Sequence, residues 1–180
     1  EHPICNRKRL GSNPRGGSNL IMYSYKIINQ SELPTWRKKM TLQGKKVCAT
    51  NGCFDLLHAG HIKYLYESSK YGDVLIIGCN GDESVRSLKG KKRPIQKEKD
   101  RVIILSALEC VSFVSIFKEK EATNFLKAVK PDFYIKGGDY TLDSINKDEK
   151  EAVNKNGGTI IFAPMSEGKS SSFIISKINF

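Results

Sequence analysis

The feature that most constrains the fold is a regular alternation of short apolar runs with amphipathic segments from Lys45 onward. The apolar runs are rich in β-branched residues and are predicted strands at 47–50, 73–80, 111–117, 132–136 and 158–164. The predicted helices lie near 60–71, 98–108, 120–129, 145–155 and 171–178. Continuously apolar strands that alternate with helices form a parallel sheet covered on both faces. We therefore predict an α/β fold of about five parallel strands, with its ligand at the carboxyl ends of the strands where the strand order reverses.

The chain divides into three predicted parts. Residues 1–21 mix Gly, Ser, Asn, Pro and Arg without periodicity, which is typical of a disordered leader or a remnant of an expression vector. Residues 22–44 hold a predicted helix from Ser31 to Met40, with Ser31 as its N-cap, and form a helical appendage. Residues 45–180 form the α/β domain, and a chain of 180 residues is long enough for one such domain with its own core.

Charge and composition exclude several function classes. The net charge is +11, but residues 1–46 hold ten basic and two acidic side chains and residues 86–101 hold eight and two, so the remainder is mildly acidic. No basic stripe with interleaved aromatics is present, and we expect no nucleic-acid partner. No apolar run approaches the roughly 18 to 20 residues of a membrane span, so we expect a cytoplasmic protein with no membrane partner. The five cysteines contain no C-x-x-C pair, which predicts reduced thiols and no protein-held metal site.

The strongest motif is the stretch Thr50–His61, which lies where the first predicted strand ends and the first predicted helix begins. Two of the three histidines of the chain occur here, spaced as H-x-G-H. At a helix start both imidazoles, His58 and His61, can reach one anion, and Gly60 lets a phosphate approach the free backbone amides. The alternative is a glycine turn with two satisfied loop histidines, but the position at a strand end favours the anion site.

The string G-C-F-D-L-L-H-A-G-H resembles the signature of the nucleotidyltransferase superfamily with H-x-G-H motifs. This superfamily joins a nucleoside triphosphate to a phosphorylated alcohol and releases pyrophosphate. The resemblance implies a Rossmann-like fold of nucleotidyltransferase type, in which His58 and His61 hold the α and β phosphates. It also implies nucleotide contacts from the turn residues Asn51, Gly52, Cys53 and Phe54. Cys53 would act through its backbone amide, and Asp55 would either tie the turn together or orient the histidines or the substrate's sugar phosphate. Class I aminoacyl-tRNA synthetases share the motif, but 180 residues leave no room for their tRNA-binding parts.

The second motif is the basic segment Arg86–Arg101. Most of its lysines are predicted to lie on a solvated face. The resemblance implies that Lys89 and Arg101, unlike these solvated lysines, bind the triphosphate. In-line displacement at a phosphorus needs cations that stabilise the negative charge of the phosphates. Asp82, after the predicted strand 73–80, matches an acidic substrate-binding residue at the family's active-site rim, although capping of a following helix explains it equally well.

Two further motifs follow predicted strands. The stretch Ala163–Ser172 formally matches a loose P-loop, but only ten residues remain after Ser170, too few to supply the rest of a P-loop sheet. The resemblance instead implies a phosphate-binding turn at the start of the last helix, made by Gly168, Ser170, Ser171 and Ser172. After the strand 132–136, two adjacent glycines predict either a simple turn or the close approach of a flat base. The second interpretation gives nucleotide contacts to Lys136, Gly137, Gly138 and Asp139.

The K-G-G-D-Y string, together with S-V-R-x-L-K-G, R-P and L-x-A-L-E-C-V, is similar to the heptose 1-phosphate adenylyltransferases. The similarity runs from about Ile27 to Ile178, nearly the whole domain. It implies transfer of AMP from ATP to a sugar 1-phosphate such as D-glycero-β-D-manno-heptose 1-phosphate, with Mg²⁺ carried by ATP. It further implies a homodimer. The related bifunctional synthases fuse this domain to a sugar kinase, so the resemblance implies either a separate sugar kinase that supplies the acceptor or a domain excised from such a fusion.

Two alternatives stay open. One is a transferase that uses CTP, or that acts on another phosphorylated alcohol such as glycerol 3-phosphate. Glycerol-3-phosphate cytidylyltransferases typically have a second acidic residue where this chain has Gly138 and an Arg-Thr-Glu-Gly run where it has residues 165–168, so these departures disfavour that branch. The other is a non-enzymatic module that binds anions through the basic N-terminal segment, which would not need the motifs described above.

Overall fold

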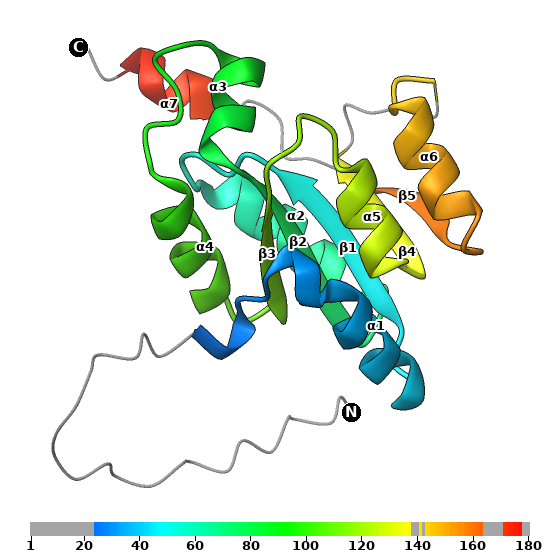
Figure 1. Cartoon of the computed structure of the whole chain (residues 1–180). Coiled ribbons are helices and arrows are strands. Elements are labelled where there is room, and N and C mark those ends of the chain that lie inside the picture. Colours follow the sequence, from blue (N-terminus) through cyan, green and yellow to red (C-terminus); the bar gives the residue numbers. More distant parts are fainter. Residues whose placement is uncertain (1–23, 138–140, 142, 164–170, 178–180) are drawn as a thin grey trace, which may run out of the picture.

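The computed structural model describes residues 24–137, 141, 143–163 and 171–177. In these ranges one sheet of five parallel strands has the order β3-β2-β1-β4-β5 (Figure 1). Its members are β1 (Val47–Gly52), β2 (Val74–Asn80), β3 (Phe113–Phe117), β4 (Phe133–Gly137) and β5 (Thr159–Ala163). The predicted five-stranded parallel sheet is therefore confirmed. The order reverses between β1 and β4, so the carboxyl ends of these two strands flank the crevice in which open α/β sheets bind ligands.

Helices connect and flank these strands. Their bounds in the described ranges are α1 (Leu33–Leu42), α2 (Ala59–Ser69), α3 (Asp82–Lys89), α4 (Glu98–Ala107), α5 (Thr123–Val129), α6 (Lys147–Asn154) and α7 (Ser171–Lys177). Every predicted helix is present, but α3 was not among the predictions. Its apolar residues are only Val85 and Leu88, too few for their spacing to indicate a helix. None of the helices in the described part of the chain combines the length and apolar content that crossing a bilayer requires.

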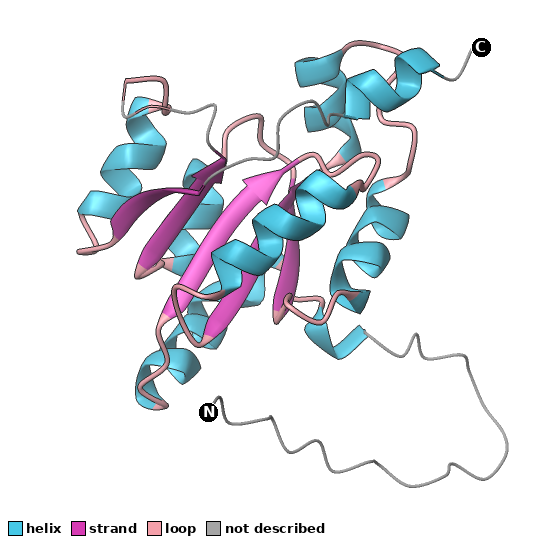
Figure 2. Cartoon of the chain, turned by 180° about the vertical axis from the view of Figure 1, so that it is seen from behind, coloured by secondary structure: helices cyan, strands magenta, loops and turns pink. Residues whose placement is uncertain are grey.

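Helices cover both faces of the sheet (Figures 1 and 2), and an apolar core lies on each face. Side chains from α1, α5 and α6 belong to one core, and side chains from α2 and α4 belong to the other. Successive residues of β2 alternate between them: Val74 and Ile76 point to the first core, Leu75 and Ile77 to the second. This burial on both faces explains why the strand sequences are apolar throughout rather than alternating with polar residues.

The segment before β1 packs against the same core. α1 begins at Leu33 rather than after Ser31, and it buries Leu33, Trp36 and Met40 in the first core. The Trp36 ring packs edge-on against Phe113 of β3, with 5.3 Å between ring centroids. These contacts bury three large apolar side chains, which is more than a loosely attached helix would do.

Lys26 fixes the start of the described chain. Its side chain is buried, and Nζ donates to the carbonyls of Leu108 and Val111 at 3.0 and 2.7 Å. Ile27 forms an isolated parallel bridge with Val114 of the edge strand β3. The segment therefore covers an edge of the sheet and satisfies backbone carbonyls beyond the end of α4.

Candidate active site

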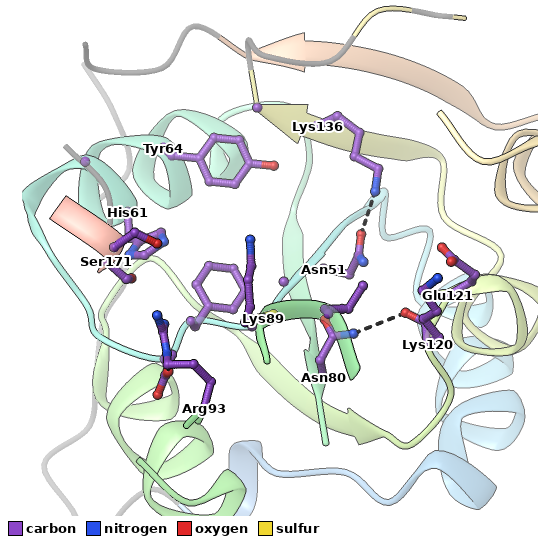
Figure 3. Close-up of a pocket in the computed structure, with 18 of the residues that line it drawn as sticks. Asn51, His61, Tyr64, Asn80, Lys89, Arg93, Lys120, Glu121, Lys136 and Ser171 are labelled. Carbon is purple, nitrogen blue, oxygen red and sulfur yellow. Dashed lines mark hydrogen bonds and ion pairs between the residues drawn. The ribbon is translucent and has the colours of Figure 1, made fainter. Parts of the chain in front are cut away.

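A cleft of about 660 Å³ opens at the carboxyl ends of β1, β2 and β4 (Figure 3). Among the described residues, it contains most of the predicted site: Asn51, Gly52, Cys53, Phe54, Asp55, His58, Gly60, His61, Lys89, Lys136, Gly137, Ser171 and Ser172. The predicted site residues Gly138, Asp139, Gly168 and Ser170 lie outside the described residues. Arg101 and Asp82 are described but do not line the cleft. The fold thus brings four separate motifs to one place, as the strand order predicts.

The two histidines of the motif stack on each other at the start of α2. His58 is the N-cap residue, and its Nδ1 accepts a hydrogen bond from the backbone N–H of His61 at 3.4 Å. Their rings lie 3.9 Å apart between centroids, at an interplanar angle of 24°. Burial, together with the charge of His58, lowers the pKa of His61 from 6.5 to about 4. His61 is therefore neutral near pH 7 in the empty site, where it can donate one hydrogen bond rather than a full charge.

A strained turn leads from β1 to this pair. Phe54 has a φ of +46°, in the left-handed region that bulky residues rarely adopt. Its ring is buried, with a centroid 5.3 Å from that of His61. A Cβ on Gly52 would lie 3.0 Å from Cε2 of Phe54, so a larger residue there would require the Phe54 ring to shift. Burial raises the pKa of the Cys53 thiol in the same turn, so this side chain stays protonated, in keeping with a contact through its backbone.

Asp55 holds the turn against the segment that follows α3. Its carboxylate is fully buried, pairs with the Arg93 guanidinium and accepts the backbone N–H groups of Ile95 and Gln96 at 2.8 and 3.0 Å. Of the two predicted roles, tying the turn together is therefore the one that these contacts describe. Arg93 itself lines the cleft, and the sequence analysis did not single it out as a site residue although it belongs to the R-P string.

Arg101 does not reach the cleft, which corrects the prediction that it grips the triphosphate. Its side chain is fully buried, and its guanidinium donates to the carbonyls of Cys53, Asn80 and Gln96 at 2.6, 2.7 and 3.0 Å. It also pairs with Asp82 at 2.9 Å. These four acceptors engage both terminal nitrogens and Nε, so Arg101 holds the backbone beneath the cleft in place. Since Lys89, at the end of α3, is exposed and lines the cleft, it is the predicted cation that can meet a phosphate.

Asp82 was predicted to bind substrate and instead connects two helix starts. Its carboxylate accepts the backbone N–H of Glu98 at 2.7 Å, while its own N–H donates to the Glu98 carboxylate at 2.7 Å. Its pairing with Arg101 engages the same Oδ1 atom. The capping alternative considered for Asp82 agrees with these contacts, because each carboxylate satisfies a free backbone donor of the other helix.

A buried polar network lies on the opposite side of the cleft, at the ends of β1 and β4. Lys136 Nζ lies 3.0 Å from Asn51 Oδ1 and 3.1 Å from Glu149 Oε2. The Tyr134 hydroxyl lies within 2.6 and 2.8 Å of the same two oxygens. Burial lowers the pKa of Lys136, and the Glu149 carboxylate acts in the opposite direction. Lys136 was predicted to contact the nucleotide, and here its ammonium is held by protein oxygens at the margin of the cleft.

The C-terminal helix reaches the same site. The Ser171 hydroxyl donates to the Leu56 carbonyl at 2.9 Å, which joins α7 to the turn before the histidines. Figure 3 shows Ser171 beside His61. The site therefore combines imidazoles, hydroxyls and a lysine, all of which can donate hydrogen bonds to phosphate oxygens.

Several lining residues were not predicted as site residues from the sequence, although Leu88 and Arg93 belong to strings quoted for the resemblance. They come from ends of strands, from loops and from helix interiors: Tyr64, Asn80, Leu88, Arg93, Lys120, Glu121, Ser144, Asn146 and Glu149. Only their position at the carboxyl edge of a predicted parallel sheet could have suggested Asn80, Lys120 and Glu121.

The family model described as cytidylyltransferase-like matches residues 49–177. The chain is 45% identical over 136 residues to bifunctional protein HldE of Geobacter sulfurreducens, which covers 76% of this chain and 27% of that protein. It is 44% identical over 158 residues to bifunctional protein HldE of Desulfatibacillum aliphaticivorans, covering 88% of this chain and 32% of that one. The chain thus spans only about a third of these relatives.

Solved structures show the same fold. A lipopolysaccharide core biosynthesis protein from Thermoplasma volcanium GSS1 has a TM-score of 0.57 at 31% identity, with 70% of this chain and all of that chain covered. A pantoate-beta-alanine ligase from Francisella tularensis has a TM-score of 0.54 at 15% identity, over 81% of this chain and 68% of that one, and this likeness concerns the fold alone.

Proposed function

The chain belongs to the cytidylyltransferase-like family and is a nucleotidyltransferase, and from this premise we propose that it transfers AMP from ATP to a sugar 1-phosphate. The acceptor we propose is D-glycero-β-D-manno-heptose 1-phosphate, and the products are ADP-heptose and pyrophosphate. The observation that carries the proposal is the stacked pair of His58 and His61 in one cleft with Lys89 and the start of α7. The names of the HldE relatives and of the lipopolysaccharide core biosynthesis protein support a sugar phosphate as the acceptor.

The proposed reaction is a direct displacement. An oxygen of the sugar phosphate attacks the α-phosphorus of ATP, a new P–O bond forms, and the bond to the bridging oxygen of the β-phosphate breaks. The acceptor oxygen is already anionic near pH 7, so no strong general base is needed and catalysis is positioning plus charge stabilisation. His58 and His61 donate hydrogen bonds to the α and β phosphates, and the Lys89 ammonium contacts the β and γ phosphates. The hydroxyls of Ser171 and Ser172 close the site from α7.

We place the base of ATP beside Gly137, where the absence of a side chain permits a flat ring to approach the backbone. The same proposal assigns Gly138 and Asp139 to the nucleotide and Gly168 and Ser170 to its phosphates. Mg²⁺ enters as part of the ATP substrate. In the described part of the chain no group of three or more metal-ligating side chains is present, so we derive no step from a protein-held ion. A homodimer, a cytoplasmic location and a separate sugar kinase remain predictions.

The test is pyrophosphate release by the purified chain with Mg²⁺. ATP and CTP are compared, each with heptose 1-phosphate or glycerol 3-phosphate, because the family description itself names cytidylyl transfer. Release that requires ATP and heptose 1-phosphate together supports the proposal. Release with CTP and glycerol 3-phosphate would move the chain to the cytidylyl branch and refute the assignment made from the K-G-G-D-Y string.

A further inference from the structure

Glu121 lies in the cleft, although a cleft for two anionic substrates has no electrostatic use for a carboxylate. It follows β3, two residues before α5 begins, and it is half-buried. In the part of the chain that the structure describes, no hydrogen bond or ion pair reaches its side chain. The nearby ammonium of Lys136 is already engaged by Glu149 and Asn51. A carboxylate in this position repels phosphates, and the part of a substrate that it can attract is one that donates hydrogen bonds.

The backbone on both sides of Glu121 is fixed by buried side chains. Asn80 Nδ2 donates to the carbonyl of Lys120 at 3.4 Å and to Ser84 Oγ at 2.9 Å. On the other side, the backbone N–H of Ala122 donates to Glu149 Oε1 at 2.8 Å. Asn80 and Glu149 are only 2% and 3% exposed, so neither anchor is free to move with solvent. The Glu121 carboxylate acts on the Lys136 ammonium through its charge, and its oxygens accept no hydrogen bond from the described residues. The cleft therefore contains, on a preorganised loop, a carboxylate whose oxygens can accept hydrogen bonds from a substrate.

The two ends of the cleft differ in chemistry. In Figure 3, His61, Ser171 and Arg93 lie to one side, whereas Asn80, Lys120 and Glu121 lie to the other. The first end can donate to phosphate oxygens. The second end presents the carboxylate of Glu121, the side chain of Lys120 and the amide of Asn80, to which Asn146 and Ser144 add further polar groups. An ionised carboxylate only accepts hydrogen bonds, and its two oxygens can receive the hydrogens of two adjacent hydroxyl groups.

We propose that Glu121 determines acceptor specificity by accepting hydrogen bonds from the ring hydroxyls of the sugar phosphate. This inference rests on the proposed function, because it deepens the assignment of the acceptor in the same site. A sugar 1-phosphate offers more hydroxyls than a nucleotide does, and the base of the nucleotide is placed at Gly137, after a different strand. The second end of the cleft is thus the sugar subsite, and the first end receives the phosphates of both substrates.

The variant Glu121→Gln tests the proposed sugar contact by the direction in which KM for the sugar 1-phosphate changes. Loss of a negative charge alone tightens the binding of both anionic substrates. Loss of a hydroxyl acceptor instead raises KM for the sugar 1-phosphate by about tenfold to a hundredfold, because hydrogen bonds to charged groups are strong. KM for ATP stays within about twofold, since no contact of the nucleotide is removed. Glu121→Asp, which keeps the charge but shortens the side chain, raises KM for the acceptor as well.

Glu119→Gln is the matched control. Glu119 lies on the same loop but outside the cleft, where its carboxylate accepts from Asn124 Nδ2 at 2.9 Å. The same substitution there removes the same charge and leaves both KM values unchanged. An acceptor KM that is unchanged or lower in Glu121→Gln overturns the inference. A raised KM for ATP, or a raised Mg²⁺ requirement with an unchanged acceptor KM, also overturns it, because Glu121 would then contact the nucleotide or the metal.

Direct binding separates this inference from the proposed reaction. Calorimetry compares a sugar 1-phosphate with methyl phosphate, which lacks ring hydroxyls, on wild-type protein and on Glu121→Gln. Weaker binding of the sugar 1-phosphate alone supports the subsite even if no pyrophosphate is released with ATP, in which case the proposed reaction fails by itself. Pyrophosphate release with equal kinetics in wild type and variant would refute the role of Glu121 and leave the reaction standing. If the wild-type protein neither binds the sugar phosphate nor releases pyrophosphate, both are refuted.

Discussion

Replacing Arg101 with methionine tests whether this cation supports the site from below or contacts the triphosphate. Its guanidinium has three carbonyl acceptors and one carboxylate partner, and its side chain has no exposed surface. Removing one member of a buried ion pair costs about 3–5 kcal/mol, because the remaining groups lose their partner inside the protein. We expect the free energy of unfolding to fall by about 4 kcal/mol, which for a chain of this size lowers Tm by roughly 8–16 °C.

Urea unfolding followed by tryptophan fluorescence measures this loss, since Trp36 is the single tryptophan and is only 8% exposed. Arg86→Met is the matched control, because Arg86 pairs with Glu83 on the exposed surface of α3. That control should change stability by less than about 1 kcal/mol. A fully stable Arg101→Met protein with a KM for ATP raised tenfold would refute the structural reasoning, because it would show that Arg101 meets the triphosphate.

Four more predictions concern stability and catalysis. The pKa of His61 is lowered from 6.5 to about 4, so between these pH values the unfolded state binds more protons than the folded state. The free energy of unfolding should therefore fall as the pH drops from 6.5 toward 4. NMR titration of the His61 ring measures its pKa directly, and a pKa near 6.5 would contradict this prediction. His61→Ala should lower kcat by about 10²-fold or more if the ring stabilises developing charge, as steady-state kinetics of a folded variant would show. Lys26→Met removes the ammonium that donates to two backbone carbonyls, and it should lower the free energy of urea unfolding by about 2–3 kcal/mol without changing the enzyme kinetics. Lys38→Met, on the exposed side of α1, is the control and should not change the free energy of unfolding measurably. Gly52→Ala places a Cβ 3.0 Å from the Phe54 ring and should lower kcat more than stability, and unchanged turnover would show that the ring moves freely.

The sequence predicted the sheet well because of the way in which its strands are buried. The strands lie between two apolar cores, so runs such as the four residues 74–77 are apolar at each position and stand out without any periodicity. α3 was missed for the opposite reason, since a short helix that buries only Ser84 and Val85 leaves no pattern. For the helix predicted at 31–40, the local pattern showed an amphipathic helix but did not show which core its apolar side packs against.

The candidate site was predictable only where a motif carried it. His58 and His61 are close in sequence and start a predicted helix, so their convergence followed from local geometry. Lys89 and Arg101 belong to one basic segment, and nothing in its composition distinguishes the exposed cation from the fully buried one. Glu121 has no motif at all, because its place in the cleft depends on anchors from β2 and α6 that only the tertiary fold brings together.

Charge pairing divides the cleft into a fixed framework and a part that substrate can engage. Arg93 and Lys136 line the cleft but are each held by a buried carboxylate, Asp55 and Glu149, so their charges are largely compensated before any substrate binds. Among the cations that line the cleft in the described ranges, Lys89 and Lys120 have no such partner. Lys89 is the one that the sequence motif indicates, and its position on the last residue of α3 leaves it in solvent. An incoming triphosphate gains most from an uncompensated and flexible charge, since a paired cation must first give up its partner. Substitutions in the framework should therefore appear first as lost stability, and substitution of Lys89 as a raised KM for the nucleotide on an unchanged fold.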